Sequence, residues 1–600
     1  MNNQEKRSSA QGIAWDLTAL YQGIDDPQIQ ADLDAALERA KAFEEKYKGS
    51  IHTDPAISAE ALCEAVQEFE SIEELMGKAG SYAGLVHAAK SDVAEHGALV
   101  QRTSEHGAEV NQHLIFFELE WLSVPDDVAE KLILSPELAR YSHYLEKERA
   151  YKDHKLTEAE EKILNVRNTT GPSAFQRLFS ETNSRLTMEV TENGESREVS
   201  LQEGLAYLYR PERELRKTAA EGLTNTLKKN EHLLTFIYNT LVLDKKTSDE
   251  LRSYDGPADS RHLANEIDAG TVNLLIESCE SRHDLVHRYY SLKAKLLGID
   301  DLKDYDRYAP VFEQQPNCEW NRCKEIVSSS YHSFSPELGD IVDRFFNENW
   351  IDAELRDGKR GGAFSASTVP DAHPYNLLNY TDNIRDVMTC AHELGHGVHQ
   401  YLAREAGYLQ QGTPLTMAET ASTFGEMVTF YRLLDEFDDP TVIRGLICSK
   451  IENAFATVFR QIVLTRFEEK AHHARRTEGE LPTERINELW MEANQPMHGD
   501  TVELTDSYGY WWMYIPHFIH TPFYCYAYSF GELLVFALYN KYKEEGEAFV
   551  PKYLGLLRAG GSDSPKNLLA GMDIDVTTSG FWLGGLNVLE QLVKRAEELA

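Results

Sequence analysis

The sequence predicts a mainly α-helical protein with a small β-sheet, and three observations lead to this prediction. Long stretches of the 600 residues repeat apolar side chains every three or four positions, which is the period of an amphipathic helix. Two short regions instead alternate apolar and polar residues, as β-strands do. The second of these regions comes just before a helical stretch that contains CAHELGHGVH, so we expect a small sheet near that helix.

The N-terminal part of the chain is rich in helix-forming residues. Residues 14–165 contain stretches such as DLDAALERAKAFEEKYKG, which predict a helical bundle or array. The pattern changes in TMEVTENGESREVSL, which alternates around Asn193 and Gly194, a pair that readily supplies the two positive φ values of a tight turn. We therefore predict a β-hairpin and a domain boundary just after it, with residues 1–203 in one domain and 204–600 in the other.

The helical period resumes at Leu201 and continues to about Asp352. It breaks again in LRDGKRGGAFS and HPYNLLNYT, which predict two short strands side by side. Asn383 and the two polar residues before it then offer N-caps for a helix that ends at Gly407. The segment CAHELGHGVH therefore lies in the middle of a helix that directly follows a strand.

The chain is strongly acidic and has no long apolar run. Its net charge of −38 and its scattered Lys and Arg residues argue against a nucleic-acid partner and against binding to a membrane. No apolar run approaches the roughly 20 residues of a membrane-spanning helix. The seven cysteines are an odd number without C-x-x-C spacing, so no disulfide framework and no cysteine zinc site is predicted. These features favour a soluble protein of the reducing cytoplasm.

Two histidines of the segment have the spacing of metal ligands. His392 and His396 are four residues apart, so on a helix both imidazoles face the same side and reach one ion at about 2.0–2.1 Å. Glu393 then lies beside the open position of the metal, where a carboxylate can take a proton from a bound water. This is the H-E-x-x-H arrangement of zinc peptidases.

The third protein ligand has to come from elsewhere in the chain. His399 lies about 10 Å from His392 along the helix axis, which is too far for a shared ion, so we expect a supporting or structural role for it. A second helix downstream carries Glu419 and Glu426 on one face. Glu419, nearer the helix start, is the favoured ligand, and Glu426 is expected to orient Glu419 or a ligating histidine. Two exposed acids on an ordinary helix remain the alternative.

HELGHGVH followed by AETASTFGE resembles the signature of the M3 family of zinc oligopeptidases, which includes thimet oligopeptidase and the oligoendopeptidase F group. WDLTALYQGIDDP, RDGKRGGAFS, HPYNLLNYTDN, PHFIHTPFYCYAYSFGELL and LLRAGGSDSP resemble oligoendopeptidase F segments in the same order, over nearly the whole chain. The resemblance implies a two-lobed helical metallopeptidase that encloses a deep substrate channel. It makes the first predicted domain an oligoendopeptidase F-type region and the second the zinc peptidase domain.

The resemblance also implies the site residues. One zinc ion per chain is held by His392, His396 and Glu419, and Glu393 is the general base. The channel of this family admits short unstructured peptides and excludes folded proteins.

An aromatic segment near the C-terminus matches further residues of the family. Tyr528 is the expected hydrogen-bond donor to the oxyanion, and His517 the expected contact to substrate or intermediate. Tyr524 and Tyr526 are expected to bind substrate. The chain departs from the thimet-type branch because Cys525 stands where that branch has a tyrosine and because the glycine-rich loop before the tyrosines is missing.

The sequence therefore predicts a zinc-dependent endopeptidase that hydrolyses internal bonds of short oligopeptides by Glu393-assisted attack of a zinc-bound water. Two alternatives remain open. One is a zinc carboxypeptidase or aminopeptidase with the same ion, and the other is a catalytically silent helical protein that only binds peptides. Neither the side-chain preference nor the oligomeric state follows from the sequence.

Overall fold

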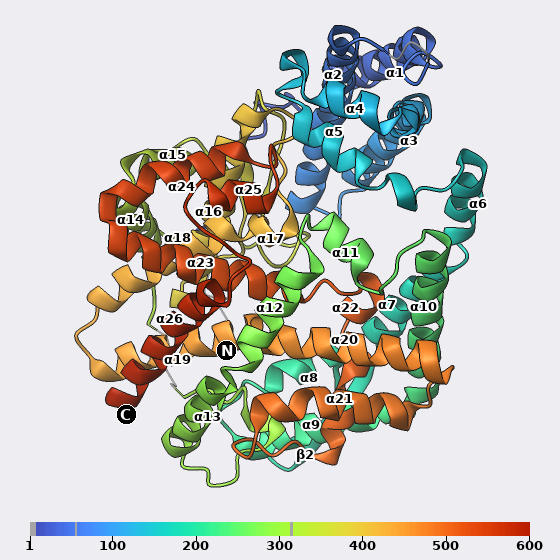
Figure 1. Cartoon of the computed structure of the whole chain (residues 1–600). Helices are drawn as coiled ribbons and strands as arrows, with labels where there is room; N and C mark the ends of the chain where they lie inside the picture. Colours follow the sequence, from blue (N-terminus) through green and yellow to red (C-terminus); the bar gives the residue numbers. More distant parts are fainter. Residues whose placement is uncertain (1–7, 54–56, 312–315) are drawn as a thin grey trace. The chain divides into compact units, whose positions relative to one another are not determined.

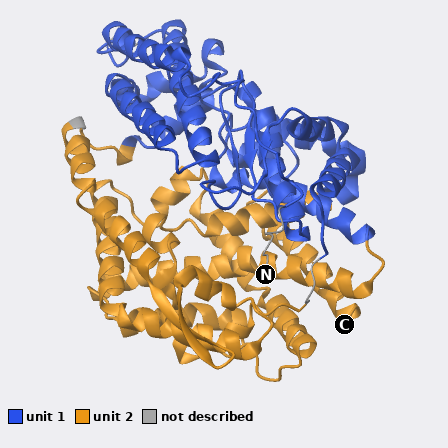
Figure 2. Ribbon diagram, turned by 180° about the vertical axis from the view of Figure 1, so that it is seen from behind, with its two compact units in different colours: residues 1–152, 315–436, 541–574 blue, residues 153–314, 437–540, 575–600 orange. Residues whose placement is uncertain are grey.

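The computed structural model describes residues 8–53, 57–311 and 316–600. These residues are mainly helical, and their strands form two small sheets (Figure 1). The predicted mainly α fold is therefore confirmed. The chain divides into two compact units (Figure 2), of which unit 1 comprises residues 1–152, 315–436 and 541–574, and unit 2 comprises residues 153–314, 437–540 and 575–600. The predicted boundary between residues 203 and 204 and the enclosed channel stay predictions.

The N-terminal part of unit 1 is a helical bundle, as predicted. Its helices are α1 (Pro27–Tyr47), α2 (Ala59–Ala89), α3 (Ala94–Ser123), α4 (Asp126–Ile133) and α5 (Ser142–Arg149). Aromatic rings from the first three helices fill its core, where Phe43 lies 6.2 Å from Phe69 and 5.5 Å from Phe117 between ring centroids. Burying each such side chain stabilises the fold by about 2–3 kcal/mol.

The rest of unit 1 contains a three-stranded sheet. Its elements are α14 (Trp320–Phe334), α15 (Pro336–Asn347), β3 (Ile351–Asp352), β4 (Phe364–Ala366), β5 (Tyr375–Leu377), α16 (Ile384–Ala403), α17 (Leu415–Ala418), α18 (Thr420–Asp435), α24 (Phe549–Ala559) and α25 (Pro565–Ala570). β5 is central, antiparallel to β4 and parallel to β3. The predicted pair of neighbouring strands is confirmed by β4 and β5. β3 was not predicted, because two residues are too short to show an alternation.

Unit 2 is helical apart from one hairpin. Its elements are α6 (Glu158–Asn168), α7 (Pro172–Arg185), β1 (Thr187–Glu192), β2 (Glu195–Ser200), α8 (Leu201–Tyr207), α9 (Arg213–Lys229), α10 (Glu231–Leu251), α11 (Asp259–Ala264), α12 (Ala269–Glu280), α13 (His283–Leu297), α19 (Pro440–Thr457), α20 (Phe459–Glu478), α21 (Thr483–His498), α22 (His517–His520), most of α23 (Tyr526–Glu545) and α26 (Ser579–Glu598). The predicted hairpin is confirmed: β1 and β2 pair antiparallel around Asn193 and Gly194, whose φ values are 54° and 84°.

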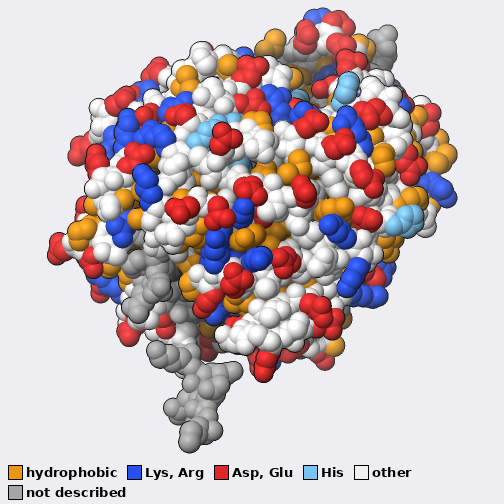
Figure 3. All heavy atoms as spheres, turned by 90° about the horizontal axis from the view of Figure 1, so that it is seen from below, with side chains coloured by type: hydrophobic (Ala, Val, Ile, Leu, Met, Phe, Trp, Pro, Cys, Tyr) orange, Lys and Arg blue, Asp and Glu red, His pale blue; other side chains and the backbone are white. Residues whose placement is uncertain are grey.

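The surface carries charges of both signs. On the face that Figure 3 shows, acidic and basic side chains are intermixed. No helix in the described parts of the chain is long and apolar enough to cross a bilayer. All seven cysteines are free thiols in the structure.

Candidate functional site

The helix that carries CAHELGHGVH begins where the sequence predicts. Asn383 has an extended backbone, and its side chain accepts a hydrogen bond from the Asp386 amide at 3.0 Å, which caps the N-terminus of α16. The helix then continues without interruption to Ala403. His392 and His396 therefore lie one turn apart on the same face, with their ring centroids 4.8 Å from each other.

Two glycines allow α18 to approach this part of α16 very closely. A Cβ atom on Gly395 would lie 2.4 Å from the carbonyl oxygen of Ala421 and 2.5 Å from Cα of Ser422. A Cβ atom on Gly425 would lie 3.0 Å from the carbonyl oxygen of Ala391 on α16, and 1.8 Å from the Tyr331 hydroxyl on α14, which donates to that carbonyl. Real Cβ atoms essentially never approach as closely as the contacts of Gly395 and the Tyr331 contact of Gly425, so larger residues at these positions would push α18 away from α16 and α14. The close packing at the two glycines thus allows the residue just before α18 to lie beside His392 and His396.

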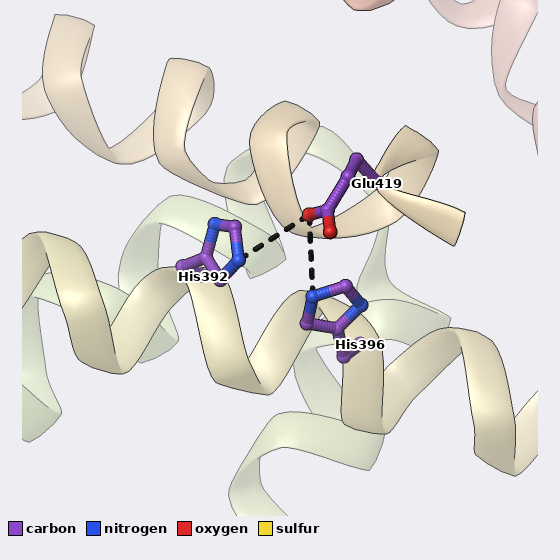
Figure 4. A group of neighbouring side chains, drawn as sticks. All are labelled: His392, His396 and Glu419. Carbon is purple, nitrogen blue, oxygen red and sulfur yellow. Dashed lines mark ion pairs between the residues drawn. The ribbon is translucent and has the colours of Figure 1, made fainter. Parts of the chain in front are cut away.

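That residue is Glu419, between α17 and α18 (Figure 4). Its Oε2 atom lies 3.4 Å from Nε2 of His392 and 3.3 Å from Nε2 of His396. The hydroxyl of Ser422 donates to the same oxygen at 2.7 Å and so fixes its position. In the described parts of the chain, these three possible ligands are the residues that could hold a metal ion together, with their ligand atoms all within 4.8 Å.

Two of the three separations between the ligand atoms match those at a zinc ion, and the two histidine nitrogens lie within 4.8 Å of each other. Two ligands that each lie about 2.05 Å from a tetrahedral ion are about 3.3 Å apart, and both Glu419–histidine distances, 3.3 and 3.4 Å, match this value. Two imidazole nitrogens and one carboxylate oxygen are also a donor set of catalytic zinc sites, which keep the fourth position for water. The donor set and both Glu419–histidine distances therefore fit the ion that the sequence predicts.

Glu426 contacts the ring nitrogen of His392 that faces away from Glu419. Its Oε1 atom is 2.6 Å from Nδ1 of His392, so it orients the ring and leaves Nε2 facing Glu419. Burial lowers the pKa of His392, but the hydrogen bond to Glu426 and the charges of Glu426 and Glu419 outweigh burial and raise it to about 9. Burial raises the pKa of Glu419, whereas the two histidines and Ser422 together hold it at about 2. The carboxylates thus stabilise positive charge at this point, as a cation requires.

Glu393 follows the first histidine and is only 7% exposed. Burial raises the pKa of its carboxyl, and the neighbouring histidines partly oppose that shift. A carboxyl whose pKa lies above its usual value accepts a proton at neutral pH more readily than an exposed one. Its position and its pKa both suit the predicted general base.

His399 does not join the possible ligands. It is 6% exposed, and burial, followed by the charge of His396, lowers its pKa to about 4, so the ring is neutral. The predicted supporting or structural role for His399 stays a prediction.

The aromatic residues form a second group, which belongs to unit 2. Nε2 of His517 lies 3.4 Å from the hydroxyl of Tyr528. The Tyr524 ring packs edge-on against Tyr528, with 4.9 Å between centroids, and stacks on His517 at 6.2 Å. Burial, and then the charge of Arg460, lower the pKa of His517, which keeps its imidazole neutral. The structure therefore brings three of the four predicted aromatic-segment residues into one cluster.

The Tyr526 side chain does not contact this cluster through its hydroxyl, which meets residues of another segment. Its side chain is fully buried, and its hydroxyl accepts a hydrogen bond from Asn265 at 2.9 Å and lies 3.0 Å from Nδ1 of His262. These contacts anchor the start of α23 on the segment that contains α11. The substrate-binding role of Tyr526 stays a prediction. His520 lies 3.1 Å from the hydroxyl of Ser180, outside the cluster.

Sequence reasoning missed Ser422, His262 and Asn265 as supporting residues. Ser422 had a signal, because it follows Glu419 by three residues, a spacing at which side chains near a helix start meet. His262 and Asn265 had none, because their partner is more than 260 residues away in the sequence.

Family models and known relatives match most of this chain. The model of "Peptidase family M3" matches residues 206–588, and that of "Oligopeptidase F" matches residues 120–187. Group B oligopeptidase PepB of Streptococcus agalactiae is 27% identical over 98% of this chain and 96% of its own. Oligopeptidase PepF of Bacillus subtilis is 25% identical over 92% of this chain and 82% of its own.

Solved structures share the fold. A crystal structure of a protein from Chlamydophila abortus has a TM-score of 0.87 and 25% identity, covering 99% of this chain and 100% of that one. Oligoendopeptidase-F from Enterococcus faecium has a TM-score of 0.71 and 23% identity, covering 95% and 98%. The family model that matches more than half of the chain confirms the resemblance found in the sequence, and this chain belongs to peptidase family M3.

Proposed function

We propose that this protein is a zinc-dependent endopeptidase that hydrolyses internal peptide bonds of short, unstructured oligopeptides. One observation carries the proposal: a single oxygen of Glu419 lies 3.3–3.4 Å from the Nε2 atoms of both H-E-x-x-H histidines, the separation that a shared zinc ion requires. Membership of a peptidase family supports the reaction, and relatives named as oligopeptidases support the substrate class. The seven free cysteines support the proposed cytoplasmic location.

Glu393 moves the proton in this proposal. When bound, zinc supplies a Lewis acid that polarises the scissile carbonyl and lowers the pKa of water. Glu393 accepts one proton from the attacking water as the oxygen–carbon bond forms. It then gives that proton to the leaving nitrogen as the carbon–nitrogen bond breaks, so the carboxylate is regenerated. His392, His396 and Glu419 would hold the ion, while Glu426 and Ser422 orient two of these residues.

Tyr528 stabilises the charge that develops on the carbonyl oxygen. A phenol hydroxyl can donate a hydrogen bond to that oxygen, and such a donor contributes about 3–4 kcal/mol to transition-state stabilisation. His517 lies against this hydroxyl at 3.4 Å and is neutral, so it can accept from Tyr528 in the resting state without removing its proton. Tyr524 packs against both side chains and limits their movement.

A sheet edge supports the binding of extended peptides. β4 is an edge strand of the three-stranded sheet and packs beside α16. An extended peptide can add to such an edge through backbone hydrogen bonds, which do not depend on its side chains. This mode of binding suits an enzyme that cleaves unfolded oligopeptides.

An internally quenched peptide with both ends blocked tests the proposal. We expect cleavage at an internal bond, located by mass spectrometry, and about one zinc per purified chain. Release of single residues from unblocked peptides alone would instead support a carboxypeptidase or aminopeptidase. A folded protein that binds peptides but lacks zinc and leaves every peptide intact would support the silent binding protein.

A further inference from the structure

A strained turn precedes the helix that carries Tyr528. The Tyr524 amide donates to the Thr521 carbonyl at 3.2 Å, which closes a four-residue turn. Pro522 occupies its second position, and Phe523 occupies the third with a φ of 59°. Turns with this arrangement normally have glycine or asparagine at the third position, because a bulky side chain is unfavourable at positive φ. The surroundings of Phe523 must therefore hold it in place.

A buried carboxyl group supplies this support. Glu468 on α20 is fully buried, and its Oε1 atom accepts a hydrogen bond from the Phe523 amide at 2.8 Å. In the part of the chain that the structure describes, its Oε2 atom has no hydrogen-bond partner. Burying a carboxyl with one oxygen unpaired is costly. A residue that breaks a packing rule in this way marks a place where the fold serves function rather than stability.

Two other side chains hold the same turn. The His472 ring, one helical turn after Glu468, packs edge-on against the Phe523 ring with 4.8 Å between centroids. From α11, Arg261 donates through Nε to the Pro522 carbonyl at 3.3 Å. The turn is therefore fixed on one side by α20 and on the other by α11.

The position of the turn determines the direction of Tyr528. The Ala527 amide donates to the Tyr524 carbonyl at 3.0 Å, and the Tyr528 amide to the Cys525 carbonyl at 3.2 Å, so the first turn of α23 is built directly on the strained turn. A change at Phe523 would shift the start of the helix. Such a shift would move the Tyr528 hydroxyl away from His517, which it faces at 3.4 Å.

We propose that Glu468 is a positioning residue for peptide hydrolysis, whose buried carboxyl holds Phe523 in the left-handed conformation that places Tyr524 and Tyr528 against His517. The inference rests on the proposed function, because it requires Tyr528 to take part in the reaction. It adds a residue that touches neither substrate nor metal, and that no local sequence pattern indicates.

The variants Glu468→Leu and Glu468→Gln distinguish the effect of the hydrogen bond to the Phe523 amide from the effect of the side-chain volume. Leucine fills the space but cannot accept from the Phe523 amide, so we expect kcat to fall by at least about tenfold, because small displacements of reacting groups have such effects. KM and zinc content should change by less than about twofold, because neither depends on Tyr528 in this proposal. Glutamine keeps an acceptor oxygen and should retain kcat within about threefold of the parent.

Asn239→Leu is the matched control. Asn239 is also a buried helix residue of unit 2 whose side-chain oxygen accepts from a backbone amide, that of Leu481, at 2.9 Å. We expect Asn239→Leu to lower the thermal stability as Glu468→Leu does, while kcat stays unchanged. An equal loss of kcat in both variants would show general destabilisation and overturn the inference.

A second variant covers the case in which Glu468→Leu does not fold. Pro522→Ala frees the second residue of the turn without altering the buried carboxyl, and we expect it to lower kcat at least about threefold with KM unchanged. Unchanged kcat in Pro522→Ala would then overturn the inference. A crystal structure of either variant should show the Tyr528 hydroxyl displaced from His517.

Tyr528→Phe distinguishes failure of the inference from failure of the proposed function. If this variant loses activity while a folded Glu468→Leu protein keeps it, only the inference is wrong. If Tyr528→Phe keeps full activity, the proposed role of Tyr528 is wrong and the inference fails with it.

Discussion

Nδ1 of His392 lies 2.6 Å from Oε1 of Glu426, on the opposite side of the ring from Glu419. This contact fixes which nitrogen of the imidazole faces the possible metal. We expect Glu426→Ala to weaken zinc binding by about 10–100-fold, because groups that orient a ligating histidine have effects of this size. Competition with a zinc chelator measures this affinity. Asp435→Asn, an exposed residue at the end of the same helix, is the control and should bind zinc like the parent.

Tyr528→Phe removes one hydroxyl and leaves the ring. If Tyr528 donates to the oxyanion, kcat should fall by about 100–1000-fold while KM for a quenched peptide stays within a few-fold. Steady-state kinetics give both values. Tyr510→Phe makes the same chemical change at a partly exposed site of unit 2 and should leave kcat as it is. Equal kcat for the Tyr528 variant and its control would contradict the proposed role.

Gly395→Ala tests the close approach of α16 and α18. The added methyl group would lie 2.4 Å from the Ala421 carbonyl, so the helices must separate. We expect a loss of about 1–3 kcal/mol in stability together with weaker zinc binding, because Glu419 moves with α18. Calorimetry and zinc titration measure these effects. Gly580→Ala in α26, where a Cβ atom meets nothing within 4 Å, should instead be neutral or stabilising.

Glu468 should make the stability of the protein depend on pH. Burial raises its pKa to about 8, opposed by the Phe523 amide and the charge of Arg261. Because this pKa lies above the ordinary value of a glutamate, the folded state binds the proton more tightly than the unfolded state. The stabilisation is complete below about pH 4.5 and is lost as the pH rises to about 8.

The variant Glu468→Gln lacks this titration. The parent should lose stability between pH 5 and pH 8, whereas the variant should not, so the melting temperature of the variant relative to the parent should increase over this range. The corresponding difference in the free energy of unfolding is a few kcal/mol, at about 1.4 kcal/mol per pKa unit. Calorimetry at several pH values measures the difference. A difference that stays constant over this range would show that Glu468 ionises normally in the folded protein.

Sequence patterns predicted those parts of the fold that depend on interactions between residues close together in the sequence. The Asn193-Gly194 hairpin and the Asn383 cap of α16 involve residues within a few positions of each other, and both are confirmed. The spacing of His392 and His396 likewise placed two possible ligands on one helix face. Glu419 followed from a second helix and from the family resemblance, because no spacing rule joins residues in different helices.

The remaining features depend on contacts between distant residues. Glu468 and Phe523 are separated by 55 residues, and although Phe523 lies in a segment that resembles the family, Glu468 lies in no such segment. The buried state of Tyr526 depends on Asn265, which is 261 residues away. Such pairs are set by how the helices pack, and packing leaves no periodic signal in the sequence.

Glu393→Gln tests the central claim most directly. Glutamine keeps the size of the side chain but cannot accept the proton of the attacking water, and Glu393 is not one of the three ligands. One preparation of this variant should be measured for zinc content and for hydrolysis of an end-blocked quenched peptide. The account predicts about one zinc per chain and a loss of hydrolysis of at least about 100-fold. Hydrolysis at the parent rate with zinc bound would contradict it.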